Sequence, residues 1–210
     1  MQKIELMAPA GNFESMQAAL DNGADSIYFG VEQLNMRARA SINFTLDDLQ
    51  EISDRCRAKN VRTYLTLNTI IYDHDLTIVK TLLQRAKDAD ITAVIAMDQA
   101  VIATAREIGM EVHISTQINI TNFETAKFYA MFADTMVLSR ELSLRQVKKI
   151  TEQIEKENVC GPSGKLVEIE IFGHGALCMA VSGKCYMSLH NHNSSANRGE
   201  CKKNCRKKLI

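Results

Sequence analysis

The feature that most constrains the fold is a regular alternation of short apolar segments with longer stretches of helical periodicity. Seven segments rich in aliphatic and β-branched residues recur along the chain, and helical patterns separate them. Uninterrupted apolar runs of this length are typical of parallel strands that are covered on both faces. We therefore expect strands at 4–7, 26–29, 62–67, 93–97, 111–115, 135–138 and 167–172.

The segments between these strands carry signals for the beginning of helices. Asn12 and Asn122 each open the pattern Asn-Phe-Glu-[Ser/Thr], which is typical of two copies of one βα unit. Thr45 with Asp48 forms a capping-box pattern, and Ser143 precedes another helical stretch. We expect helices at 13–20, 46–59, 76–87, 99–108, 123–132 and 144–157.

Six βα units followed by a seventh strand predict an α/β fold of the TIM-type (βα) barrel class, with a doubly wound open sheet as the alternative. The pattern holds no eighth strand, so we expect an incomplete barrel or an eighth position filled by a terminal segment. We also expect the chain to be a fragment or a short version of a longer protein. Residues 1–177 would form the barrel domain, and residues 178–210 a cysteine-rich, basic segment that continues from strand seven.

The composition limits the setting in which the protein works. With 210 residues, of which 46% are hydrophobic, the chain is long enough to bury the core of one domain. Lys3 and Glu5 stand where a signal peptide needs an apolar run, and no segment approaches the roughly 20 apolar residues of a membrane span. We therefore expect a cytoplasmic protein without a membrane partner.

Basic residues gather near the C-terminus, although Lys+Arg and Asp+Glu balance at 25 each over the chain. Such a segment attracts polyanions such as RNA, and a basic loop that contacts only solvent is the alternative. Between residues 184 and 210 a single acid, Glu200, accompanies Lys184, Arg198, Lys202, Lys203, Arg206, Lys207 and Lys208.

Four of the six cysteines lie in the same segment: Cys178, Cys185, Cys201 and Cys205. Clustered thiols in an intracellular chain indicate a metal site before disulfides. Zinc sites favour cysteines separated by about two to four residues, which fits only Cys201 and Cys205, whereas wider spacing suits an iron–sulfur cluster held from several loops. Spacing alone leaves an iron–sulfur cluster, a zinc site and redox-active or plain thiols as alternatives.

The segment around these cysteines resembles the signature of the U-type peptidase family 32, the collagenase-like proteases. Further matches at 8–11, 28–30, Arg37, 68–69, 115–117 and 138–142 extend the resemblance over nearly the whole chain. The signature residues are Glu170, Phe172, Gly175, Cys178, Gly183, Cys185 and Ser188.

The resemblance implies an activity that the family name does not state. Several family members are oxygen-independent hydroxylases that act on tRNA, on ribosomal RNA or on ubiquinone precursors. They carry a [4Fe-4S] cluster on cysteines, and the RNA-modifying members depend on prephenate, the hydroxyl donor. The resemblance therefore implies RNA hydroxylation, with 5-hydroxyuridine at the tRNA wobble position as its most specific form, and a cluster on Cys178, Cys185, Cys201 and Cys205.

Side chains that follow the strands gather on one face of a barrel, where active sites are built. Asn68, Thr116 and Gln117 follow strands three and five and are candidates for substrate binding. Arg37 and Arg39 follow strand two, and arginine binds carboxylates and phosphates through paired hydrogen bonds. We expect this pair to hold a dicarboxylate such as prephenate or an RNA phosphate, and a solvated loop is the alternative.

Strand-end residues are also the candidates for catalysis, with Arg37 among them. Arg140 and Glu141 follow strand six, where an internal ion pair that shapes the site is the alternative to a catalytic role. His174 precedes Cys178 by four residues, and imidazole titrates near neutral pH. It is a candidate acid, base or donor to a cluster sulfide, and a structural hydrogen bond is the alternative.

The remaining cysteines and histidines are expected to be structural. Cys56 continues an apolar helical stripe, and Cys160 lies at the opposite end of the barrel from the cysteine-rich segment. His113 lies inside strand five and is expected in the core or at its rim. His190 and His192 are expected in a polar loop, with replacement of a cysteine ligand as the alternative.

Two functions stay open beside an iron–sulfur-dependent RNA hydroxylase component. One is a collagenase-like peptidase, although the sequence has neither a Gly-x-Ser-x-Gly nucleophile motif nor a His-Glu-x-x-His zinc motif. The other is a zinc-stabilised RNA-binding module without catalysis.

Overall fold

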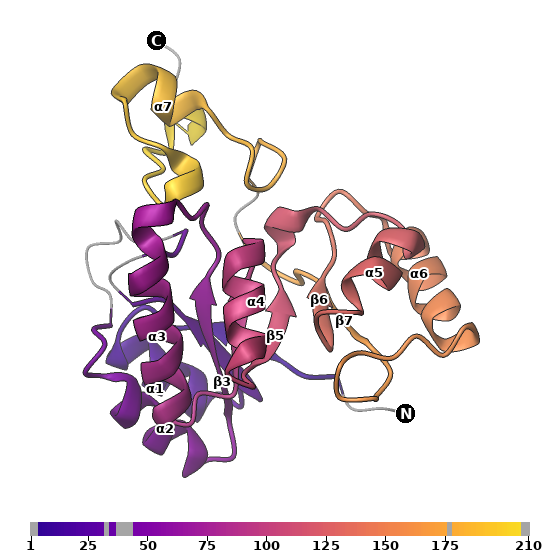
Figure 1. The fold of residues 1–210 in the computed structure, drawn as a ribbon, viewed down its shortest axis with the longest axis horizontal. Helices are drawn as coiled ribbons and strands as arrows, with labels where there is room; N and C mark the ends of the chain where they lie inside the picture. Colours follow the sequence, from indigo (N-terminus) through magenta and orange to yellow (C-terminus); the bar gives the residue numbers. More distant parts are fainter. Residues whose placement is uncertain (1–3, 32–33, 37–43, 176–177, 207–210) are drawn as a thin grey trace.

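The computed structural model describes residues 4–31, 34–36, 44–175 and 178–206. Its centre is one sheet of seven parallel strands, in which each strand pairs with its neighbours in the sequence. In the described residues β1 and β7 do not pair with each other, so the expected incomplete barrel is confirmed (Figure 1). The strands are β1 (Met7–Pro9), β2 (Ser26–Phe29), β3 (Arg62–Leu67), β4 (Ala93–Ala96), β5 (Glu111–Ile114), β6 (Thr135–Val137) and β7 (Glu168–Glu170).

Six helices connect consecutive strands, as expected for (βα) units. They are α1 (Phe13–Asp21), α2 (Leu49–Arg57), α3 (Leu76–Asp88), α4 (Gln99–Glu107), α5 (Phe123–Tyr129) and α6 (Leu144–Lys156). None of the helices in the described ranges is long and apolar enough to span a membrane.

The C-terminal segment adds short helical elements outside the barrel. Figure 1 shows this segment in yellow, projecting beyond the sheet near the beginning of α3. Its elements are α7 (Met187–His192), η3 (Ala196–Arg198) and η4 (Asn204–Arg206). Two further 3-10 turns, η1 (Asp73–Asp75) and η2 (Thr116–Ile118), lie in the loops that follow β3 and β5.

The repeated Asn-Phe-Glu-[Ser/Thr] pattern begins two helices in the same way, as predicted. The Oδ1 atom of Asn12 accepts a hydrogen bond from the backbone N–H of Ser15 at 2.8 Å, and Asn122 accepts one from Thr125 at 2.9 Å. These side chains satisfy backbone donors that the first helical turn leaves free. The backbone N–H of Asn12 also donates to the Ser15 hydroxyl at 3.2 Å, which completes a capping box.

The first strand lies further along the chain than the sequence predicts. The expected range 4–7 shares only Met7 with β1, and Ile4 and Leu6 are 89% and 60% exposed. The register of the sheet explains the shift, because β2 begins at Ser26 and its partner in β1 is Met7. The prediction for residues 4–6 was therefore wrong.

The second helix also begins later than predicted, at Leu49 rather than Leu46. The carboxylate of Asp48 accepts hydrogen bonds from the backbone N–H of Thr45 at 2.7 Å and from its hydroxyl at 2.8 Å. These two hydrogen bonds from Thr45 to Asp48 hold residues 45–48 in a turn that precedes the helix. The seventh strand is likewise shorter than the expected 167–172.

The hydrophobic residues of the sheet fall into two clusters of different size. Leu65, Leu67 and Ile114 are fully buried in the main core, which also includes residues of the helices. Tyr64 and Ile95 belong to a separate small cluster that includes Ala93. Most of the buried apolar residues belong to the main core, so the open barrel depends mainly on packing between the sheet and the helices.

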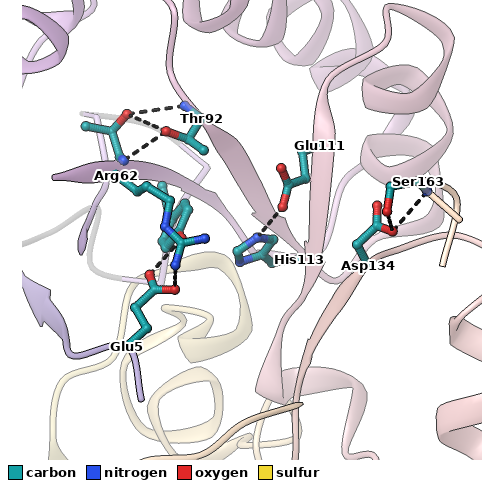
Figure 2. Close-up of polar contacts among 9 residues, drawn as sticks. Glu5, Arg62, Thr92, Glu111, His113, Asp134 and Ser163 are labelled. Carbon is teal, nitrogen blue, oxygen red and sulfur yellow. Dashed lines mark hydrogen bonds and ion pairs between the residues drawn. The ribbon is translucent and has the colours of Figure 1, made fainter. Parts of the chain in front are cut away.

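Polar pairs join the strands near their amino-terminal ends (Figure 2). Glu5 forms an ion pair with Arg62 and accepts a hydrogen bond from the Tyr64 hydroxyl at 2.8 Å. The predicted core position of His113 is confirmed, with its Nε2 atom 3.1 Å from Glu111 Oε1. Arg62 and Glu111 are the first residues of β3 and β5. These contacts therefore lie at the opposite end of the sheet from the candidate side chains that follow the strands.

Candidate functional site

Three polar side chains meet where β3 and β5 end, and we call Asn68, Ser115 and Gln117 the amide cluster. The Nδ2 atom of Asn68 lies 3.4 Å from Ser115 Oγ and 3.5 Å from Gln117 Oε1. The Ser115 hydroxyl donates a short hydrogen bond to Gln117 Oε1. The structure thus brings together Asn68 and Gln117, two of the five predicted substrate-binding residues, and both are half-buried.

The loop that follows β2 reaches the amide cluster. The backbone N–H of Met36 donates to Asn68 Oδ1 at 3.1 Å, across 32 residues of sequence. Arg37 and Arg39, the predicted anion-binding pair, lie outside the described residues. The contact at Met36 nevertheless places the start of their loop beside Asn68.

Thr116, another predicted substrate-binding residue, has a different environment. Its side chain is buried, with the residue 8% exposed. The Thr116 hydroxyl donates to the backbone carbonyl of Leu138 at 3.4 Å. This contact connects η2 with the residue that follows β6.

Arg140 and Glu141 do not form the internal ion pair that was the alternative to catalysis. The Nη2 atom of Arg140 donates to the Ser182 hydroxyl at 2.6 Å, whereas Glu141 accepts a short hydrogen bond from the Ser139 hydroxyl. That hydroxyl is the main reason why the pKa of Glu141 lies below its usual range. The ion-pair interpretation was wrong because the two side chains bind different partners.

The C-terminal segment contacts the barrel at a first anchor, formed by Ser182 and Gly183. Asn119 donates through Nδ2 to the Ser182 carbonyl at 2.8 Å, and Arg140 binds the Ser182 hydroxyl. Gly183 has φ of +70°, and a Cβ atom there would lie only 3.0 Å from Gln117 Cβ. A glycine is therefore required both by the backbone conformation and by the close approach to the amide cluster.

A second anchor joins the same segment to the loop that follows β3. Arg198 forms an ion pair with Asp75 at 2.5 Å and donates to the Ile70 carbonyl at 2.9 Å. Its guanidinium carbon lies 4.4 Å from the centre of the Tyr72 ring. The Asp75 side chain is 7% exposed, and Arg198 holds the pKa of this carboxyl below its usual range. The pair is therefore a partly desolvated clamp rather than a surface contact.

Asn197 extends this second anchor to a cysteine. Its carbonyl accepts from the backbone N–H of Ile70 at 3.2 Å, and its Oδ1 accepts from the backbone N–H of Cys185 at 3.1 Å. The backbone N–H of Lys202 donates to the buried Ser188 hydroxyl at 2.9 Å, which holds the chain next to Cys201 against α7. The two anchors thus hold the cysteine-bearing segment against the loops that follow β3, β5 and β6.

The four cysteines of this segment are free, and none is buried. Cys178, Cys201 and Cys205 are exposed, and Cys185 is half-buried. Within the described ranges no three His, Cys, Asp or Glu side chains surround one point closely enough to hold a metal ion. The donor chemistry suits a thiolate-bound centre, and metal binding would require these thiols to move together.

The other cysteines and histidines that the sequence singled out do not share one environment. His190 and His192 lie in α7 rather than in the expected polar loop. Cys56 is fully buried, and burial raises the pKa of its thiol to about 11. The Cys160 thiol donates to the Asn158 carbonyl at 3.4 Å, before β7. His174 is exposed, and the Nε2 atom of His192 lies 3.1 Å from the Asn204 side chain, which keeps His192 beside η4.

Exposed basic side chains lie on the same segment as the cysteines. Lys184, Lys202, Lys203 and Arg206 are all exposed. Arg198 differs from them because it is committed to the second anchor. Lys207 and Lys208 lie outside the described residues.

Sequence reasoning missed the residues that hold the segment in place. Asp75 and Arg198 are separated by 123 residues, and neither belongs to a motif that predicts their contact. Asn119 has φ of +58° at the end of η2, which a sequence pattern does not indicate. Only Gly183 carried a signal, because a glycine in a signature commonly marks a close backbone approach.

The family model described as Peptidase family U32 matches residues 11–209. The chain belongs to this family. It is 57% identical over 204 residues to a protein of Porphyromonas gingivalis named collagenase, covering 97% of this chain and 49% of the relative. It is 34% identical over 209 residues to tRNA hydroxylation protein P of Escherichia coli, covering 98% of this chain and 44% of that relative. The chain thus spans about half the length of the curated relatives it matches.

A solved structure of the family shares the fold. The structure of the U32 peptidase Mk0906 matches with a TM-score of 0.58 at 15% identity, covering 80% of this chain and 67% of that one. A phosphonopyruvate hydrolase matches with a TM-score of 0.52 at 14% identity, covering 82% of this chain and 76% of that one. These likenesses support the barrel fold that the strand pattern predicted.

Proposed function

We propose that the protein acts in the oxygen-independent hydroxylation of tRNA, in which 5-hydroxyuridine forms at the wobble position. Relatives named tRNA hydroxylation protein P match along nearly the whole chain in Escherichia coli and in Bacillus subtilis, where the name carries the number 1. The observation that carries the proposal is the position of the basic, cysteine-bearing segment, which two anchors hold against the amide cluster and its neighbouring loops. Since the chain spans about half of these relatives, the activity of the whole protein is part of the proposal.

The proposed cofactor is a [4Fe-4S] cluster on Cys178, Cys185, Cys201 and Cys205. Four free thiols in one segment are a suitable donor set for such a cluster, and their location outside the core leaves them able to approach one another. When bound, the cluster would supply one-electron redox chemistry. Zinc on the same thiols is the alternative, and it would make the segment a structural module.

The proposed hydroxyl donor is prephenate, which carries two carboxylates. Arg140 uses one terminal nitrogen for Ser182, while its buried Nε atom has no hydrogen-bond partner among the described residues. In the proposal this donor binds a carboxylate oxygen, and Arg37 and Arg39, which lie outside the described residues, supply the other paired hydrogen bonds. In the proposal, Asn68 and Gln117 bind polar groups of the substrate, and His174 and Glu141 are the candidates for proton transfer.

Exposed basic side chains next to the cysteines support RNA as the macromolecular substrate. Phosphates bind lysine and arginine in a sequence-independent way, and each contact releases counterions. Because Lys184, Lys202, Lys203 and Arg206 lie on the same segment as the thiols, an RNA strand bound there would pass close to the proposed cluster.

Nucleoside mass spectrometry of total tRNA tests the proposal. A strain that lacks the gene should lose 5-hydroxyuridine and its derivatives from tRNA, and the gene in trans should restore them. Unchanged levels of these nucleosides in the deletion strain would contradict the proposed function.

A peptidase is the second candidate, because the relative with 57% identity is named collagenase. In the described ranges no histidine ring hydrogen-bonds to a cysteine sulfur, so a ready Cys–His nucleophile pair is absent from that part of the chain. Gelatin cleavage by the purified protein, abolished by a thiol reagent or a chelator, would favour this candidate. An anaerobically purified protein that contains iron and sulfide but leaves gelatin intact would favour the hydroxylase.

A further inference from the structure

We propose that Tyr72 and Tyr186 stack on unpaired bases of the RNA strand that passes Cys185. The proposal rests on the proposed function, since it assigns a binding surface for the same RNA substrate. It adds two residues that neither the signature nor the amide cluster contains.

Arg198 holds the aromatic ring of Tyr72 in place. Its ring lies 4.4 Å from the guanidinium carbon of Arg198, and Arg198 is fixed by its ion pair with Asp75. Tyr72 is nevertheless 52% exposed. Because the clamp already fixes the ring, stacking a base on its exposed part would lose less conformational entropy than stacking on a free side chain.

Tyr186 is joined to the second anchor through its neighbour in the sequence. It follows Cys185, whose backbone N–H binds the side chain of Asn197, the residue before Arg198. Tyr186 is 66% exposed. The chain of contacts that runs from the loop after β3 to Cys185 thus has Tyr72 at one end and, at the other, the residue next to Tyr186.

The segment that carries Tyr186 and contacts Tyr72 has the positive charge that a nucleic-acid strand requires. The exposed basic side chains belong to the same segment, and they are Lys184, Lys202, Lys203 and Arg206. Aromatic rings set among basic residues are typical of surfaces that bind single strands, where phosphates meet the cations and bases stack on the rings. A partner protein would not need this cationic surface, so RNA is the occupant that charge complementarity favours.

The test uses the full chain and a short single-stranded RNA that carries one 2-aminopurine. Stacking on an aromatic ring quenches this base, so binding should lower its fluorescence. Tyr72→Leu should weaken affinity roughly tenfold, within the range of about 1–3 kcal/mol for one stacked base, and Tyr72→Phe should retain it. The same pattern is expected at Tyr186.

A matched control separates stacking from a general loss of apolar surface. Phe128 on α5 is 53% exposed, an exposed fraction close to the 52% of Tyr72. Its ring packs beside Tyr129 and Phe132 instead of the second anchor. Phe128→Leu should leave RNA affinity and quenching unchanged. The dependence of affinity on salt should stay the same in Tyr72→Leu, because no phosphate contact is removed.

Two outcomes would count against different claims. RNA binding with equal affinity and equal quenching in Tyr72→Leu, Tyr186→Leu and Phe128→Leu would overturn the stacking surface and leave the RNA proposal standing. Failure of the wild-type chain to bind any RNA, with binding of a protein or lipid at these tyrosines instead, would overturn both.

Discussion

Glu170, the last residue of β7, shows how a single carboxyl can set the pH dependence of stability. The residue is half-buried, and its Oε2 atom is buried with no hydrogen-bond partner among the described residues. This burial raises the pKa of the group above 4.5, an effect that His113 only partly opposes. Well below pH 4.5 the carboxyl is neutral in both the folded and the unfolded state. Above the folded-state pKa the folded protein carries the full cost of a buried charge, so stability falls as the pH rises between these values.

We therefore predict that Glu170→Gln stabilises the protein at neutral pH. The free energy of unfolding of the variant should exceed that of the wild type at pH 7, and the difference should vanish below pH 4.5, where the wild-type carboxyl is protonated. Urea unfolding across this range measures both quantities. A variant that is less stable than the wild type at pH 7 would show that Glu170 makes a favourable ionic contact.

At Arg37, a single substitution can separate the effect of side-chain geometry on activity from the effect of charge. Lysine keeps the charge but loses the planar pair of donors, so Arg37→Lys should lower hydroxylation by at least about tenfold while leaving iron content and fold intact. Arg39→Lys is the paired control, and we expect a milder effect. Near-normal 5-hydroxyuridine levels with Arg37→Lys would remove this residue from the proposed site.

Sequence reasoning at the residue scale succeeded where a position follows a strand and failed where a partner is distant. Asn68 and Gln117 were predicted to share a face because parallel strands end at one edge, and the structure confirms it. Arg140 and Glu141 were paired because they are adjacent, yet Ser182, 42 residues away, binds the arginine. Tertiary contacts of this kind depend on how the C-terminal segment folds back, which no local pattern encodes.

At the scale of elements, the contact of the C-terminal segment with the barrel depends on one glycine. Gly183→Ala would bring a Cβ atom to 3.0 Å from Gln117 and place alanine at φ of +70°. Gly164→Ala is a matched control, because Gly164 has φ of +77° and nothing lies within 4 Å. Both variants should lose about 1 kcal/mol through backbone strain, but only Gly183→Ala should also release the segment.

Alkylation of Cys185, followed by mass spectrometry, measures this release. The half-buried thiol of Cys185 should react faster with iodoacetamide in Gly183→Ala than in the wild type or in Gly164→Ala. Equal rates in all three proteins would show that the first anchor does not restrain the cysteine.

If the basic segment binds RNA phosphates, its lysines should contribute to the salt dependence of RNA affinity. Replacing Lys202 and Lys203 by glutamine should weaken binding to all single-stranded RNAs alike and flatten the plot of log affinity against log salt by about 0.7 for each lost phosphate contact. Lys148→Gln on α6, where the side chain is 74% exposed, serves as the control. An unchanged slope in the double variant would mean that these lysines contact only solvent.

Element type was predictable along the whole barrel, whereas element ends were less so. The apolar runs identified β2 to β7, and side-chain caps such as Asn12 marked where helices begin. β1 was misplaced because its position follows from pairing with Ser26, which lies outside the strand itself. The short helices of the C-terminal segment were not predicted, since α7 depends on tertiary contacts such as that of Ser188 with Lys202.

At the scale of the whole molecule, seven parallel strands form an open barrel that presents one polar edge. Two anchors fix the cysteine-bearing segment to that edge, and the basic side chains lie on the same segment. We propose that this arrangement is the working part of a tRNA-hydroxylating protein. The chain belongs to the Peptidase U32 family, which includes relatives named tRNA hydroxylation protein P.

The most direct measurement is the amount of 5-hydroxyuridine in tRNA from a deletion strain that carries variants of the gene. Cys185→Ala should abolish the modification and the iron content together, because Cys185 is proposed as a cluster ligand. Cys160→Ser should support normal levels, because Cys160 lies before β7, where its thiol donates a hydrogen bond to the Asn158 carbonyl. Full modification with Cys185→Ala, at the level of Cys160→Ser, would contradict the account.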